Sequence, residues 1–76
     1  MPFSALVLTL AQDRTDVLTR LSARPDLEVG ELQGGRLPVV LDSPDARAAA
    51  RGIEALSREP GVVHVDLIAA HYGENL

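Results

Sequence analysis

Two stretches of this chain share one pattern, in which a helix ends at a proline and a strand begins directly after it. The segments LSARPDLEV at 21–29 and LSREPGVVHV at 56–65 match with one inserted residue, about 35 residues apart. In a chain of 76 residues, a repeated helix-to-strand junction leaves room for little more than one further strand before each helix. The repeat therefore predicts two similar halves packed together in a single domain, residues 1–76.

Hydrophobic patterning predicts the remaining elements. Strands are expected at residues 5–11, 27–32, 36–42 and 62–70, with one helix between the first two strands and a second between the last two. The order is βαββαβ. With right-handed crossovers, this order predicts an α+β ferredoxin-like sandwich, in which a four-stranded antiparallel sheet carries two helices on one face.

Polar residues mark the start of each expected helix. Asp13 is the expected N-cap of the first helix, and Ser43 that of the second, with Pro44 in its first turn. Charged residues four apart are expected on the solvent side of the helices: Asp16 with Arg20, and Glu54 with Arg58.

The central hairpin decides which side chains share a face of the sheet. A two-residue turn at Gly34 and Gly35 would place Leu27 and Val29 opposite to the apolar residues of the returning strand. A three-residue loop at 33–35 would bring them to the same face, and we favour this loop. The residues then expected to face the helices are Leu6, Leu8, Leu10, Leu27, Val29, Leu37, Val39, Leu41, Val63, Val65 and Leu67.

No segment remains to cover the other face of the sheet. That face is expected to carry Ala5, Val7, Thr9, Glu28, Gly30, Leu32, Arg36, Pro38, Val40, His64, Asp66 and Ile68. Its apolar members would form an exposed patch edged by Glu28 and Asp66, which is typical of an interaction surface. A solvated sheet face with a few tolerated apolar residues is the alternative. Pro38 is unexpected in a central strand and indicates a bulge or an irregular stretch there.

Composition excludes several classes of function. The chain has no cysteine and two histidines, so neither thiolate zinc sites nor disulfides are possible, and no metal or other cofactor is expected. The net charge is −4 and tryptophan is absent, which disfavours nucleic acid. No segment has the pattern of a signal peptide or a membrane span, so we expect no membrane association and a cytoplasmic location.

Catalytic readings find little support in the residues. His64 and Asp66 share a strand face, but no serine or cysteine nucleophile is expected beside them. Pro2 could act as the base of a small tautomerase, although such enzymes differ in their helix pattern. Acylphosphatase has the same element order, but only Arg14 could serve its anion loop. We therefore expect no enzyme and assign no catalytic residue.

Four runs of residues resemble one known family: ALVL at 5–8, PDLEV at 25–29, GGRLPVVL at 34–41 and PGVVHVDLIAAHYGE at 60–74. In this order and spacing the chain resembles the NapD family of small cytoplasmic chaperones for maturation of the periplasmic nitrate reductase. Pro38 departs from the family pattern, where a plain apolar residue is expected.

The resemblance implies a ferredoxin-like fold and no catalysis. It also implies binding of the twin-arginine signal peptide of the catalytic subunit, as a helix on the open sheet face, until the molybdenum cofactor is loaded. Glu28 and the first strand match family positions, whereas His64 and Asp66 follow from side-chain alternation only. The expected peptide-binding residues are Ala5, Val7, Thr9, Glu28, Val40, His64, Asp66 and Ile68. A regulatory domain that binds a small molecule is the alternative function, and both a monomer and a weak dimer remain open.

Overall fold

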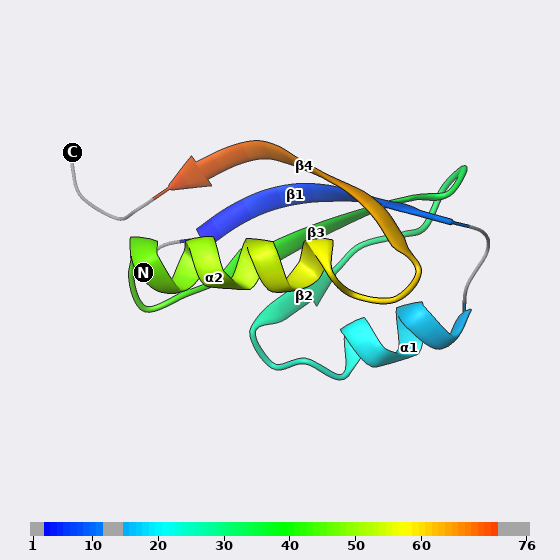
Figure 1. The fold of residues 1–76 in the computed structure, drawn as a ribbon, viewed down its shortest axis with the longest axis horizontal. Helices are drawn as coiled ribbons and strands as arrows, with labels where there is room; N and C mark the ends of the chain where they lie inside the picture. Colours follow the sequence, from blue (N-terminus) through cyan, green and yellow to red (C-terminus); the bar gives the residue numbers. More distant parts are fainter. Residues whose placement is uncertain (1–2, 12–14, 72–76) are drawn as a thin grey trace.

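Four strands form one antiparallel sheet, and both helices pack on the same side of it (Figure 1). The computed structural model describes residues 3–11 and 15–71. The elements follow in the order β1 (Phe3–Leu10), α1 (Thr15–Ser22), β2 (Leu27–Val29), β3 (Arg36–Asp42), α2 (Ala46–Ser57) and β4 (Val62–His71). The strand order is β2-β3-β1-β4, which confirms the predicted ferredoxin-like sandwich.

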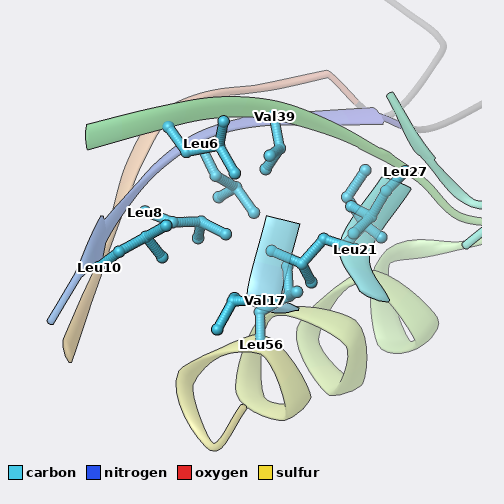
Figure 2. Packing of buried hydrophobic residues seen from close by; sticks show 10 residues of the cluster. Leu6, Leu8, Leu10, Val17, Leu21, Leu27, Val39 and Leu56 are labelled. Atoms are coloured by element: carbon cyan, nitrogen blue, oxygen red, sulfur yellow. The ribbon is translucent and has the colours of Figure 1, made fainter. Parts of the chain in front are cut away.

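The hydrophobic core lies between the sheet and the two helices (Figure 2). Alternate residues of β1 and β3 point to the same side, so their leucines and Val39 are almost completely buried. Each of these side chains contributes about 1.5–3 kcal/mol by leaving water. The buried apolar residues are Leu6, Leu8, Leu10, Val17, Leu21, Leu27, Leu37, Val39, Leu41, Ala49 and Leu56.

Two bulges in β4 change the faces expected for that strand. Thr9 pairs with His64, but Leu10 pairs with Val62, so Val63 is an extra residue in the ladder. Val62 therefore packs against the core, whereas Val63 is 65% exposed, and the prediction that Val63 is a core residue was wrong. A second shift, between the pairs Ala5–Ala69 and Leu6–Leu67, leaves Ile68 as the extra residue.

Leu67 has the predicted orientation without the predicted burial. It lies opposite Leu6 on the helix-facing side, yet it is 53% exposed. Since β4 is an edge strand, its outer flank is open to solvent. The prediction that Leu67 is a core residue was therefore wrong, whereas Val29 and Val65 pack against the core while partly buried.

The β2–β3 connection is a two-residue turn, and the predicted three-residue loop was wrong. Gln33 and Arg36 exchange two backbone hydrogen bonds of 3.0 Å around Gly34 and Gly35, whose φ angles of 59° and 78° suit glycine. The change of face comes earlier in the chain. Gly30 pairs with Pro38 and Gln33 pairs with Arg36, so Glu31 and Leu32 form a bulge opposite the single residue Leu37. The five apolar residues predicted to share a face therefore do so: Leu27, Val29, Leu37, Val39 and Leu41.

The bulge at Glu31 and Leu32 also turns the Leu32 side chain from the open face to the core. Pro38, on the neighbouring strand, lies in a regular part of β3. Leu32 packs against the core, so its predicted place on the open face was wrong. The Pro38 carbonyl accepts the N–H of Gly30 at 2.8 Å, which directs the Pro38 nitrogen toward β2 as well. Because the Pro38 nitrogen faces β2, its missing N–H removes no hydrogen bond between β3 and β1. On the β2 side, the strand already ends at Val29. No bulge is needed in β3, whose register with β1 is continuous.

The N-cap of helix α2 lies two residues later than predicted. The N-cap is Asp45, whose Oδ1 accepts the Ala48 N–H at 2.8 Å, and not Ser43, which is buried beside the helix start. The Asp13 cap of α1 lies outside the described residues. Both predicted ion pairs form, Arg20 with Asp16 at 3.4 Å and Arg58 with Glu54 at 2.8 Å.

Arg20 also connects the two halves of the fold. Its Nε donates to a Glu59 carboxylate oxygen at 2.8 Å, and a second guanidinium nitrogen donates to the Pro60 carbonyl at 3.0 Å. The hydrogen bond to Glu59 raises the pKa of Arg20 above its ordinary value. Helix α1 is thereby held against the loop between α2 and β4.

Candidate functional site

The candidate site is the sheet face that lies away from both helices (Figure 1). None of the described helices covers it. Three cross-strand rows of residues build the middle of this open face: Glu28, Val40, Ala5 and Ala69; Pro38, Val7 and Asp66; and Arg36, Thr9 and His64.

The pairing registers bring nearly all the predicted site residues into these rows. Ala5, Val7 and Thr9 run along β1 in the middle of the face, and each is half-buried. Val40 and Glu28 lie on the β2 side, and His64 and Asp66 on the β4 side. Ile68 is exposed at the bulge, while Ala69 takes the position opposite Ala5 that alternation had given to Ile68.

Asp66 is already paired within the fold. One of its carboxylate oxygens lies 2.9 Å from His64 Nε2, and the other lies 3.5 Å from an Arg36 guanidinium nitrogen. Arg36 belongs to β3 and Asp66 to β4, so this ion pair crosses the neighbouring strand β1. This contact could not be predicted from sequence patterns, because it depends on the registers of two separate strand pairs. Asp66 therefore presents less unbalanced negative charge to a partner than a free carboxylate would.

Two glutamates on the β2 side of the face are free of such pairing. Neither Glu28 nor Glu31 makes an ion pair or side-chain hydrogen bond within the described residues. Both are exposed. The prediction missed Glu31, because simple alternation along residues 27–32 assigned it to the helix-facing side and the bulge at Glu31 and Leu32 changes that assignment.

Each of these glutamates lines a shallow hollow beside Pro38. One hollow, of about 410 Å³, is lined by Val7, Glu31, Gln33, Arg36 and Pro38. The other, of about 320 Å³, is lined by Glu28, Val29, Gly30, Pro38, Val39 and Val40. Pro38 lines both hollows. The surface thus combines apolar contact area with carboxylates at its edge, an arrangement that suits a cationic and partly apolar ligand.

Metal binding, catalysis and membrane insertion find no support in the described part of the chain. Its His, Asp and Glu residues form no group of three or more that could hold a metal ion. The 2.9 Å contact between His64 and Asp66 is an exposed polar pair on a strand. None of the described helices is both long and apolar enough to cross a membrane. Pro2 and Arg14, on which the tautomerase and acylphosphatase alternatives rest, lie outside the described residues.

Comparison with known proteins gives one result on the family. A family model described as NapD protein matches residues 3–74, which is nearly the whole chain. The comparison with curated proteins found no match. The matched residues include every strand of the sheet and all the residues of the open face.

Proposed function

The chain belongs to the NapD family, and on this basis we propose that it is a chaperone for the catalytic subunit of a periplasmic nitrate reductase. In this proposal it binds the twin-arginine signal peptide of that subunit in the cytoplasm. Binding delays export until the molybdenum cofactor has been inserted. The protein acts by binding alone and catalyses no reaction.

The open sheet face is the observation that carries the proposed binding site. A signal peptide that docks as a helix needs an apolar surface for one side and acceptors for its arginines. Val7 and Val40 supply half-buried apolar contact in the middle of the face. The proposed contact residues are Ala5, Val7, Thr9, Glu28, Val40, His64, Asp66 and Ile68.

Glu28 is the preferred arginine acceptor in this proposal. A guanidinium group binds a free carboxylate more readily than one that already has a cationic partner. Glu28 has no such partner within the described residues, whereas Asp66 is shared by Arg36 and His64. We therefore expect the two arginines to bind on the β2 side of the face, with Asp66 in a lesser role.

Calorimetric titration with the signal peptide tests the proposal. We expect saturable binding of a twin-arginine peptide from a nitrate reductase catalytic subunit. A twin-lysine version should bind at least about tenfold more weakly, because lysine cannot form the two parallel hydrogen bonds that arginine makes to a carboxylate. No heat and no NMR shift at high peptide concentration would contradict the proposal for that peptide.

A charge reversal at Glu28 tests the site itself. Glu28→Arg should weaken peptide binding by about tenfold or more, because a charge-assisted hydrogen bond is replaced by repulsion. Glu54→Arg, which makes the same charge change on the exposed side of α2, is the matched control and should leave the affinity unchanged. Thermal unfolding should show that both variants fold, with a small loss of stability in Glu54→Arg, which replaces the ion pair with Arg58 by a like-charge pair. Equal affinities of the two variants would remove Glu28 from the site.

A further inference from the structure

The outer flank of β4 is a long unprotected sheet edge. The strand is 10 residues long, and within the described residues no other strand pairs with its outer side. It contains no lysine and no proline, the residues that commonly block pairing at such edges. Three large apolar side chains are exposed along it: Val63, Leu67 and Ile68, at 65%, 53% and 63%.

The backbone groups that face this outer flank follow from the hydrogen bonds of β1. Leu10 donates its N–H to Gly35, on the β3 side. Since successive residues of a strand direct their N–H groups to alternate sides, Thr9 and Val7 direct theirs to β4. Their partners His64 and Asp66 therefore point inward. Val65 and Leu67, which flank Asp66, present their N–H and C=O groups to the open edge, whereas Val63 is the extra residue of a bulge, where alternation does not hold.

We propose that this edge pairs with the same edge of a second copy of the chain. The two β4 strands run antiparallel about a two-fold axis that passes through Val65. In this register Val65 lies opposite Val65 of the second copy, Val63 lies opposite Leu67, and His64 lies opposite Asp66. Val65 then exchanges two backbone hydrogen bonds with Val65 of the second copy, and the exposed side chains of Val63 and Leu67 lie next to each other.

The positions of Asp66 and His64 favour this register over the two neighbouring registers, in which the two-fold axis passes through one of these residues. With the axis at Asp66, two carboxylates would lie directly opposite each other, which is destabilising. With the axis at His64, two imidazoles would meet and Asp66 would lie opposite Val62. Only the axis at Val65 places His64 opposite Asp66 while pairing the exposed Val63 with the exposed Leu67. The self-complementary order of polar and apolar residues is therefore what points to a second copy as the occupant.

The bulges limit how far the pairing can extend. Val63 and Ile68 are the extra residues of the β1–β4 ladder, and the strand twists more strongly at such points. The paired stretch thus runs from Val63 to Leu67. A contact of this size predicts a weak, concentration-dependent dimer, and it does not require a signal peptide.

Sedimentation of the full chain, over about 10 µM to about 1 mM, tests the inference. We expect reversible formation of a dimer. Leu67→Lys should raise the dimer dissociation constant by about tenfold or more, because it disrupts both Val63–Leu67 pairs of the symmetric contact. Ala50→Lys, on the exposed side of α2, makes the same charge change away from the edge and should leave the constant unchanged.

Amide hydrogen exchange gives a second readout that does not depend on a substitution. The amides of Val65 and Leu67 should exchange more slowly as the protein concentration rises, while those on the β2 edge stay unchanged. Val63→Lys, at another exposed position, replaces Leu67→Lys if that variant fails to fold. A monomer throughout the concentration range would overturn the inference. A dimer that Leu67→Lys and Val63→Lys leave intact, with no protection at Val65, would equally overturn it.

Discussion

Gly30 and Pro38 are matched residues on neighbouring strands. A Cβ atom on Gly30 would lie 2.9 Å from Pro38 Cγ, which is closer than real Cβ atoms approach, and 3.1 Å from the Pro38 carbonyl oxygen, which is tighter than most such contacts. The Gly30 N–H binds that same carbonyl at 2.8 Å. The absence of a side chain at residue 30 is therefore what lets a proline lie in a central strand next to β2. Pro38 is recognisable in the sequence as unusual for a central strand. Sequence patterns do not indicate that Gly30 is its neighbour.

Substitution of Gly30 by alanine should destabilise the fold. We expect Gly30→Ala to lower the free energy of unfolding by about 1–3 kcal/mol, since the added methyl group must displace Pro38 or the backbone. Urea denaturation followed by circular dichroism measures the change. In a Pro38→Ala background the loss should be smaller, because the Cγ atom is absent. An equal loss in both backgrounds would show that Pro38 is not the cause.

Helix α2 begins at the Asp45 cap, whose side chain accepts a backbone hydrogen bond from the first turn. Asp45→Ala should lower the free energy of unfolding by about 1 kcal/mol, because the Ala48 N–H loses its acceptor at the first turn. Asp45→Asn should retain most of the stability, since its amide oxygen can accept the same hydrogen bond. Chemical denaturation of the three proteins provides the comparison. Similar losses in the Asn and Ala variants would contradict a capping role.

Sequence patterns predicted the elements well where strand alternation continues without interruption. Leu6, Leu8 and Leu10 repeat every second residue, and the same rule holds from Leu37 to Leu41, so β1 and β3 were assigned to the correct faces. The rule failed for Leu32 and Val63, each of which lies at a bulge. A bulge depends on which backbone groups pair across two strands, and the order of apolar residues along one strand does not contain that information.

The candidate site was predictable to a similar degree. That one sheet face would stay uncovered followed from counting the elements. The pairing of Arg36 with Asp66 did not follow, because it requires the register of β3 with β1 and of β1 with β4 together. Glu31 escaped notice for the same reason as Leu32, since both lie in the bulge before the turn.

The proposed arginine acceptor and the proposed dimer contact lie on opposite outer strands of one sheet, while the peptide surface between them reaches both strands. Glu28 lies on β2 and Leu67 on β4, the two outer strands. The dimer joins the sheets through β4, so the open face of each copy remains accessible on its β2 side. His64 and Asp66 belong to both proposals, and they connect the peptide surface to the dimer contact.

Glu28 and Leu67 lie on opposite outer strands, so substitutions at these two residues should each affect only one of the two interactions. We expect Glu28→Arg to leave the dimer dissociation constant within about twofold, and Leu67→Lys to leave the peptide affinity within about twofold, because well-separated sites add within about 0.5 kcal/mol. Sedimentation and calorimetry on the same two variants test both expectations. If Leu67→Lys weakened peptide binding as much as Glu28→Arg, the peptide would have to contact the outer edge of β4 as well as its open face. Dimer formation and peptide binding would then compete for one surface, and raising the protein concentration would lower the apparent peptide affinity.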